Sequence, residues 1–378
     1  MTETRPLLFE PLQLRGLTLP NRIVVSPMCQ YAAVDGRAQD WHLMHVGNLA
    51  VSGTGLLIME MTNVEPIGRI TPGCMGLWDD ATETALKRVV DFCKGHSPTP
   101  MAVQLAHAGR KGSTTPPWAG RQPIPESGGG WRAVAPSAVP IMEGLPTPRA
   151  LSRGEIQAIV EKFADSTRRA ERIGYDAIEL HGAHGYLLHQ FLSPLSNRRE
   201  DDYGGSLENR MRLTLEVFDA VRGEWPDDKP LGIRLSATDW MDGGWDIEQT
   251  VTLCKALAAR GCDWIDVSSS GLAPQAQVPI GPGYQVPFAE RIKQETGITT
   301  MSVGMITEPQ QAEDILQAGQ ADLIAMARGL LYDPRWAWHA AEQLAPDTGG
   351  LVAYPDQYLR CRPWVRNDVF GEKGSGMR

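Results

Sequence analysis

The sequence predicts an α/β fold, a single (β/α)8 barrel spanning residues 1–378, and three observations lead to this prediction. Eight short apolar runs recur along the chain, and helical patterns lie between them. The runs are apolar on both faces, as parallel strands covered by helices are. The chain has 378 residues, 42% of them hydrophobic, which is enough to bury the large core that such a barrel needs.

The predicted strands follow one another in chain order. They are residues 22–26, 55–60, 101–106, 177–181, 231–235, 264–267, 300–303 and 323–326. Helical patterns occur at residues 155–173, 207–225, 247–260, 309–317 and 334–344, and residues 41–45 resemble one face of an amphipathic helix. The first long helix follows Ser152, a good N-cap, and ends at Gly174. Strands that alternate with helices favour a closed parallel barrel over an open sheet.

Three segments lie outside this alternation. Residues 8–21 predict a hairpin that caps the bottom of the barrel ahead of the first strand. Residues 111–150 are rich in Gly, Pro and Trp and too long for an ordinary loop after the third strand, so we expect an excursion at the catalytic mouth. Residues 354–378 form a C-terminal tail that is first aromatic and basic and then rich in Gly.

Composition restricts the partners. The chain carries 36 Lys and Arg against 45 Asp and Glu, a net charge of -9, and has no basic block, which argues against nucleic acid as a partner. No apolar stretch has the roughly 18 residues of a membrane span. The six cysteines are scattered without a Cys-x-x-Cys pair, which indicates reduced thiols in a cytoplasmic protein and offers no iron–sulfur ligand set.

Active sites of such barrels are built at the carboxyl ends of the strands, so the residues there are the candidates. The first strand leads into Ser26-Pro27-Met28-Cys29-Gln30-Tyr31, the third carries Gln104, the fourth leads into His181 to Tyr186, and the fifth carries Arg234 with Ser236. The sixth leads into Ser268-Ser269-Ser270-Gly271, the seventh into Gly304-Met305 and the eighth into Ala327-Arg328. Hydroxyls, glycines and an Arg after strands six to eight predict a phosphate cradle. A neutral substrate would not need one, but a phosphorylated cofactor would.

Each candidate also has a structural interpretation. His181 and His184 could be buried structural histidines or metal ligands, as in a metal-dependent hydrolase. No third ligand stands at a usable spacing, so we predict no metal site. Cys29 could be a small buried hydrophobe, and Arg234 and Arg328 could form ion pairs.

Several motifs occur together between residues 8 and 358. They are Ser26-Pro27-Met28-Cys29, Gln104 with His107-Ala108-Gly109-Arg110-Lys111, the group His181, His184 and Tyr186, Phe191-Leu192-Ser193-Pro194 up to Asn197, and Asp202-Tyr203-Gly204-Gly205-Ser206 with Glu208-Asn209-Arg210. In combination they resemble the Old Yellow Enzyme family. The Cys that follows Ser-Pro-Met is similar to the thermophilic-like branch, which includes the xenobiotic reductases.

The resemblance implies an FMN-dependent ene-reductase. The family binds FMN noncovalently over the barrel mouth, takes electrons from NAD(P)H, and passes a hydride from flavin N5 to the β-carbon of an α,β-unsaturated carbonyl compound. By resemblance, His181 and His184 hydrogen-bond the substrate carbonyl oxygen and Tyr186 protonates the α-carbon. A flavin dehydrogenase or demethylase that runs the same hydride step in the oxidative direction remains an alternative.

The resemblance also assigns the remaining contacts. Gln104 and Arg234 match residues at the flavin pyrimidine edge and N1, and Cys29 matches a residue beside the flavin ring that modulates its potential without acting as a nucleophile. The other flavin contacts are Ser26, Pro27, Met28, Met61 and, at the phosphate end, Gly304, Met305, Ala327 and Arg328. Tyr31 and Lys111 are expected to line the substrate site. Arg360 fits an arginine that reaches into a neighbouring subunit, so we expect a homodimer or higher homo-oligomer.

Overall fold

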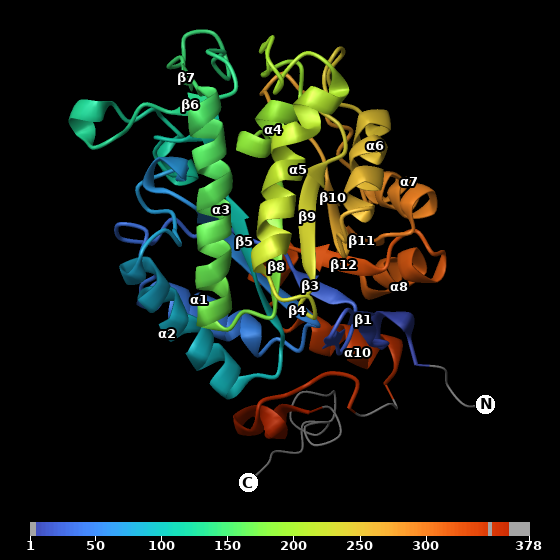
Figure 1. Ribbon diagram of the computed structural model, residues 1–378. Helices are drawn as coiled ribbons and strands as arrows, with labels where there is room; N and C mark the ends of the chain where they lie inside the picture. The colour runs from blue at the N-terminus through green and yellow to red at the C-terminus, as the bar shows by residue number, and fades with distance from the viewer. Residues whose placement is uncertain (1–4, 347–349, 363–378) are drawn as a thin grey trace.

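Eight parallel strands form a closed barrel in the computed structural model, which describes residues 5–346 and 350–362 (Figure 1). Around the barrel the strands are β3 (Ile23–Val25), β4 (Leu56–Asn63), β5 (Met101–Ala106), β8 (Ala177–Gly182), β9 (Leu231–Ser236), β10 (Trp264–Ser268), β11 (Thr299–Ser302) and β12 (Leu323–Met326), which pairs with β3. Each predicted run overlaps one of these strands, so the predicted barrel is confirmed.

Helices surround the barrel. They are α1 (Asp40–Ala50), α2 (Asp80–His96), α3 (Arg153–Ile173), α4 (Leu187–Leu192), α5 (Leu207–Glu224), α6 (Ile247–Ala258), α7 (Val286–Thr296), α8 (Pro309–Gln317), α9 (Arg328–Tyr332) and α10 (Trp336–Leu344). The five long predicted helices and the helical face at residues 41–45 are all present. Two long helices, α2 and α7, were not predicted. The sequence did carry a signal for α2, because Asp79 caps its start and accepts the Thr82 N–H.

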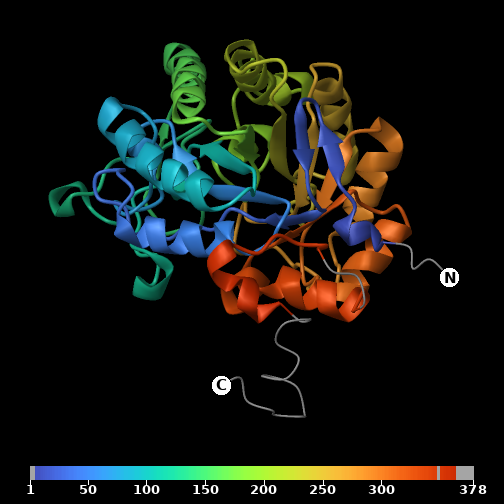
Figure 2. The same ribbon diagram turned by 90° about the horizontal axis from the view of Figure 1, so that it is seen from below.

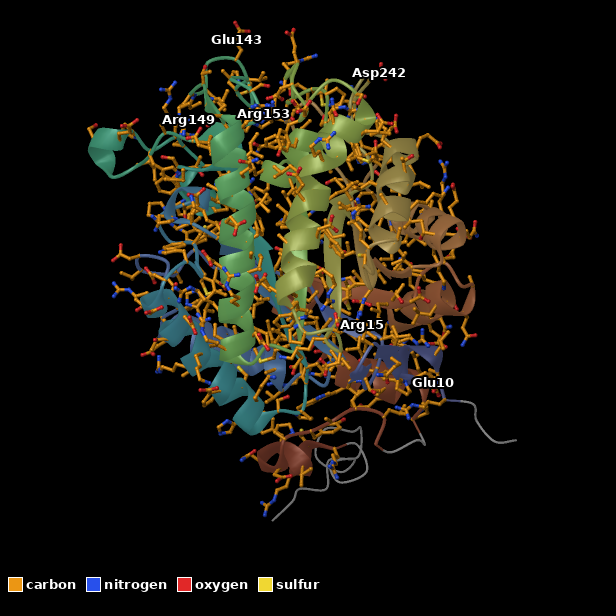
Figure 3. The ribbon with its side chains drawn as sticks, viewed as in Figure 1. Glu10, Arg15, Glu143, Arg149, Arg153 and Asp242 are labelled. Atoms are coloured by element: carbon orange, nitrogen blue, oxygen red, sulfur yellow. The ribbon has the colours of Figure 1, made fainter. Side chains whose placement is uncertain are left out.

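The N-terminal hairpin covers one end of the barrel, as predicted. Strands β1 (Leu12–Leu14) and β2 (Leu17–Leu19) pair antiparallel, and Leu14 and Leu19 pack against interior side chains of the barrel strands. At the turn, Arg15 bonds both carboxylate oxygens of Asp263, at 2.7 and 2.8 Å. Figure 2, seen from below, shows the blue hairpin on this end, and Figure 3 labels Arg15 there.

The predicted excursion lies at the opposite end. Its two short strands, β6 (Val134–Ala135) and β7 (Arg149–Ala150), pair parallel and lie near α4 at the top of Figure 1. Arg149, labelled in Figure 3, forms an ion pair of 2.6 Å with Glu155 in the first turn of α3. The excursion is therefore fixed to the helix that follows it.

The C-terminal segment lies at the hairpin end. Its described part includes a 3-10 helix, Asp356–Cys361, drawn in red at the bottom of Figure 1. Residues 363–378 of the predicted tail lie outside the described residues. In the part of the chain that the structure describes, no helix has the length and apolar character needed to cross a membrane.

Candidate active site

A cavity of about 200 Å³ lies at the carboxyl ends of the strands. It is lined by Pro27, Cys29, Tyr31, Met61, Gln104, His181, His184, Tyr186 and Arg234. Every one of these residues belongs to the predicted site. They come from segments far apart in the sequence, which meet because parallel strands of a barrel end at the same rim.

A larger cavity of about 770 Å³ shares Tyr31 and Tyr186 with the first. Much of its wall comes from residues 112–148 of the excursion, together with Lys111. The ring of Trp118 in the excursion lies edge-on to Tyr31, at a centroid distance of 5.7 Å. The excursion thus builds much of the wall of the larger cavity beside the site.

His181 is a neutral imidazole that presents a donor. Burial and the nearby Arg234 lower its pKa well below the usual range. The Ala183 N–H donates to its Nδ1 at 3.3 Å. The proton of the neutral ring therefore sits on Nε2, which can donate to a ligand in the cavity.

His184 is held by polar contacts with two serines, Ser236 and Ser268. Burial and Arg234 lower its pKa as well, and its backbone has a φ of 58°, a conformation that is strained for a residue other than glycine. Its backbone N–H donates to Ser236 Oγ at 2.9 Å, and its Nε2 lies 2.7 Å from Ser268 Oγ. When the serine hydroxyl donates to Nε2, the ring proton sits on Nδ1. The two imidazoles are perpendicular, with centroids 5.1 Å apart.

Tyr186 lies next to this pair. Its ring centroid is 4.8 Å from that of His181. Burial, with smaller effects of Cys29 and Tyr31, raises the pKa of the phenol well above its usual value. Tyr186 therefore remains protonated at neutral pH and is available as a proton donor.

Lys111 connects two loops of the site. Its Nζ donates to the carbonyl oxygens of His184 and Gly271, each at 2.7 Å, and lies 5.1 Å from the centre of the Tyr186 ring. Burial lowers the pKa of Lys111 to about 7, and the neighbouring Arg121 and Arg110 add to this. The lysine thus fixes the loop after β8 against the loop after β10.

These two loops also touch directly through glycines. Gly271 has a φ of 92°, and a Cβ there would lie 2.5 Å from the His184 Cα. We predict that Gly271→Ala destabilises the protein by about 2 kcal/mol or more, because the new methyl group would displace His184. Chemical unfolding measures this. Gly243→Ala is the matched control, since its φ is 69° but its Cβ would meet nothing within 4 Å; equal losses for the two variants would contradict the prediction.

Cys29 is a protonated thiol in this setting. Burial, with Cys74 and Glu60 nearby, raises its pKa well above the usual value. This agrees with the expectation that it is not a nucleophile. It packs with Tyr31 and Tyr186 against a small buried cluster that contains Met61 and Cys74.

The flavin contacts expected on the inner wall come from buried polar side chains. Arg234 forms an ion pair with Asp266, with its Nε 3.0 Å from Oδ2, and Gln104 donates to Glu179 at 2.8 Å. Asp266 and Glu179 were not predicted as site residues. Their signal in the sequence was a carboxylate inside an otherwise apolar strand, which is costly unless it is paired.

The phosphate end of the expected site lies on neighbouring strands. Gly304, with a φ of 123°, and Met305 follow β11, while Ala327 and Arg328 follow β12 at the start of α9. Among the described residues, the Arg328 side chain forms no hydrogen bond or ion pair, and the buried Ser26 hydroxyl after β3 has no hydrogen-bond partner. Free polar groups at the ends of the two adjacent strands β3 and β12 fit the phosphate and ring of FMN.

Two hydroxyls of the predicted phosphate cradle form bonds within the protein. Ser268 Oγ contacts His184 Nε2, and Ser269 Oγ donates to Gln285 Oε1 at 2.7 Å. Ser268 thus supports the imidazole pair, and the cradle itself stays a prediction.

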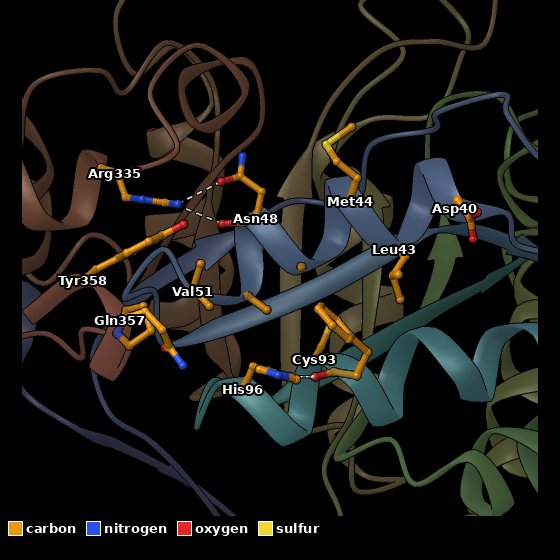
Figure 4. Close-up of a pocket in the computed structure, with 14 residues that line it drawn as sticks. Asp40, Leu43, Met44, Asn48, Val51, Cys93, His96, Arg335, Gln357 and Tyr358 are labelled. Atoms are coloured by element: carbon orange, nitrogen blue, oxygen red, sulfur yellow. Dashed lines mark hydrogen bonds between the residues drawn. The ribbon is translucent and has the colours of Figure 1, made fainter.

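Arg360 does not line the active-site cavity of its own chain. A separate pocket of about 440 Å³ lies between α1, α2 and the C-terminal segment (Figure 4). There Arg335 donates to the backbone and side-chain oxygens of Asn48, both at 2.9 Å, and its guanidinium lies 5.8 Å from the centre of the Tyr358 ring. These contacts fix the segment at the barrel end opposite α4.

Comparisons with known proteins show the family of this chain. Residues 7–347 match the NADH:flavin oxidoreductase / NADH oxidase family. An NADPH dehydrogenase of Geobacillus thermodenitrificans is 44% identical over 356 residues, which are 94% of this chain and 98% of the relative. An NADPH dehydrogenase of Listeria monocytogenes is also 44% identical, with the same coverage of 94% and 98%.

A solved structure of morphinone reductase in complex with tetrahydroNAD is similar in fold. It has a TM-score of 0.74 and 30% identity, covering 93% of this chain and 96% of the reductase. The resemblance to the Old Yellow Enzyme family and the expectation of an FMN-dependent oxidoreductase are thereby confirmed. The chain belongs to the NADH:flavin oxidoreductase / NADH oxidase family.

Proposed function

We propose that the protein is an ene-reductase that uses NADPH and FMN to reduce the activated C=C bond of α,β-unsaturated carbonyl compounds. The observation that carries the proposal is the meeting of His181, His184 and Tyr186 in one cavity, two imidazoles with lowered pKa values beside a phenol with a raised one. Two neutral donors and one proton source are what the reduction of an enone requires from the protein.

FMN, when bound, would supply the hydride chemistry of the reaction. Gln104 and Arg234 would hold its pyrimidine edge, Ser26, Pro27, Met28, Cys29 and Met61 would contact its ring, and Gly304, Met305, Ala327 and Arg328 would hold its phosphate. The cation of Arg234 also favours negative charge on the reduced ring. Tyr31 and Lys111 line the space in which the substrate stands.

The imidazoles bind the substrate carbonyl oxygen. His181 donates from Nε2, which the Ala183 N–H leaves protonated, and His184 donates from Nδ1 when the Ser268 hydroxyl donates to its Nε2. Negative charge grows on the carbonyl oxygen as the β-carbon receives hydride, so preformed donors stabilise the transition state more than the ground state. Tyr186 then gives its phenolic proton to the α-carbon.

An absorption spectrum of the purified protein tests the proposal. Flavin bands that bleach on anaerobic addition of NADPH and return with 2-cyclohexenone would support it. Bleaching without return would refute the ene-reductase activity and favour oxidation of an amine or a similar substrate, as in a dehydrogenase or demethylase. A protein that binds no FMN on incubation would refute the proposal altogether.

We further propose a cytoplasmic homodimer in which Arg360 acts on the partner's site. In its own chain the segment Asp356–Cys361 lies at the far end of the barrel, so any action on a cavity must be in trans. Arg360→Ala is expected to raise the KM for the enone about tenfold, because a charge-assisted hydrogen bond is lost, while the FMN content stays unchanged. A monomer in sedimentation, or an unchanged KM, would contradict this.

A further inference from the structure

A buried carboxyl group, that of Glu179, bonds a residue of the cavity wall and is not used by the proposed mechanism. Glu179 projects into the barrel from β8 and has no exposed surface. Its Oε1 accepts a hydrogen bond from Gln104 Nε2 at 2.8 Å, and its Oε2 accepts one from Trp264 Nε1 at 3.2 Å. Both oxygens of the carboxylate are therefore acceptors for N–H donors on β5 and β10.

These contacts decide how the Gln104 amide is turned. An amide has one donor end and one acceptor end, and here the NH₂ end is directed to Glu179. Gln104 lines the cavity, and its Oε1 accepts no hydrogen bond from the described residues. The amide therefore offers an acceptor to whatever occupies the cavity.

We infer that Glu179 is a positioning residue that fixes the Gln104 amide with its oxygen toward the cofactor, so that the site selects a ring edge carrying an N–H group. The inference rests on the proposed FMN site. The pyrimidine edge of a flavin carries one N–H, at N3, between two carbonyl groups, so an acceptor opposite N3 and a cation such as Arg234 near the carbonyl oxygens complement it.

Two other charged side chains face Glu179. Asp266 on β10 raises its pKa in addition to burial, while Arg234 on β9 opposes this. Burial and the like charge of Asp266 make the ionised form of Glu179 costly, so this carboxyl group is not expected to stabilise the fold. A neutral isostere is therefore expected to leave the melting temperature of the cofactor-free protein unchanged or higher, which separates positioning from a purely structural role.

The decisive variant is Glu179→Gln. The new amide has one acceptor for two donors, so either the Trp264 N–H loses its partner or Gln104 turns and presents NH₂ to the flavin N3–H. We expect FMN to bind on the order of tenfold to a hundredfold more weakly to the deflavinated variant, measured by quenching of flavin fluorescence.

A flavin without the N–H group gives the specific readout. The wild-type protein should bind N3-methyl-FMN at least about tenfold more weakly than FMN, since the methyl group removes the donor that Gln104 accepts. In Glu179→Gln the ratio of the dissociation constants for N3-methyl-FMN and FMN should fall close to one. Adding Trp264→Phe to Glu179→Gln removes the competing donor, so FMN binding should recover to within a few-fold of the value for Trp264→Phe alone.

The control is another buried carboxylate that accepts from N–H donors. Glu313, at the hairpin end of the barrel, accepts from the backbone N–H groups of Leu7 and Leu8, both at 2.8 Å, and additionally from Gln317 Nε2 at 2.7 Å. Glu313→Gln should leave both the FMN affinity and the preference over N3-methyl-FMN unchanged.

The outcomes are distinguishable. A wild-type protein that binds no FMN would overturn the proposed function together with this inference. A wild-type protein that binds FMN without preferring it over the N3-methyl form would overturn the inference alone, even if no variant folded. Binding and preference that are the same in Glu179→Gln as in the wild type would also overturn the inference alone.

Discussion

Replacing Tyr186 with Phe is expected to slow reduction of an enone by about 10²–10⁴-fold, the usual contribution of a positioned proton donor. The ring would keep its place beside His181, where the centroids are 4.8 Å apart, so only the phenolic proton is removed. Because burial raises the pKa of Tyr186, the wild-type residue holds that proton throughout the neutral range. Stopped-flow measurement of flavin reoxidation by 2-cyclohexenone gives the rate.

The other half of the catalytic cycle is the internal control. Reduction of the flavin by NADPH needs no proton from Tyr186, so its rate should be the same in Tyr186→Phe and the wild type. Equal loss in both halves would show that the substitution damages the site as a whole. An unchanged rate with 2-cyclohexenone would show that another group, or water, supplies the proton.

The barrel could be predicted from the sequence because its strands are short, apolar on both faces and regularly spaced. The hairpin and the excursion were predicted from their departure from that pattern. Helix α7 was missed because it begins at Val286 after a Gly- and Pro-rich stretch and buries only Val286, Ala289 and Ile292 on one side. Three buried positions in eleven residues give a weak periodic signal.

Alternation along a strand could not place Met61. Met59 and Met61 are two residues apart and should face the same side of the strand. The pairing of β4 with β5 shifts register between them, so that Met59 belongs to the main core and Met61 lines the cavity. The position was therefore accessible only through resemblance.

Most residues that line the cavity could be predicted because they lie at or near the carboxyl end of a predicted strand. The residues that support it were not predicted. Ser268 was assigned to a phosphate cradle, yet it contacts His184 across two strands, and Glu179 and Asp266 were taken as parts of apolar runs. Which residues support the cavity depends on which strands are neighbours and on the stagger between them. Neither property can be predicted from the local sequence.

Replacing His181 or His184 with Ala is expected to lower the rate of enone reduction by about 10²–10³-fold, as the loss of one oxyanion donor does elsewhere. Since burial and Arg234 lower the pKa values of both imidazoles, the wild-type donors stay neutral across roughly pH 6–8 and add no titration to the rate there. Stopped-flow reoxidation over that range measures both effects.

Ser268→Ala is expected to lower the rate of enone reduction less than His184→Ala does. It removes the hydroxyl that lies 2.7 Å from Nε2 and leaves the imidazole in place, so the ring loses its preference for the Nδ1 proton but not its ability to donate. A loss of about tenfold, smaller than that of His184→Ala, is expected from one hydrogen bond. FMN content should be unchanged in all three variants. Full activity in His181→Ala and His184→Ala would mean that the carbonyl oxygen is held elsewhere, and the larger cavity against Lys111 and the excursion would then be the place to search.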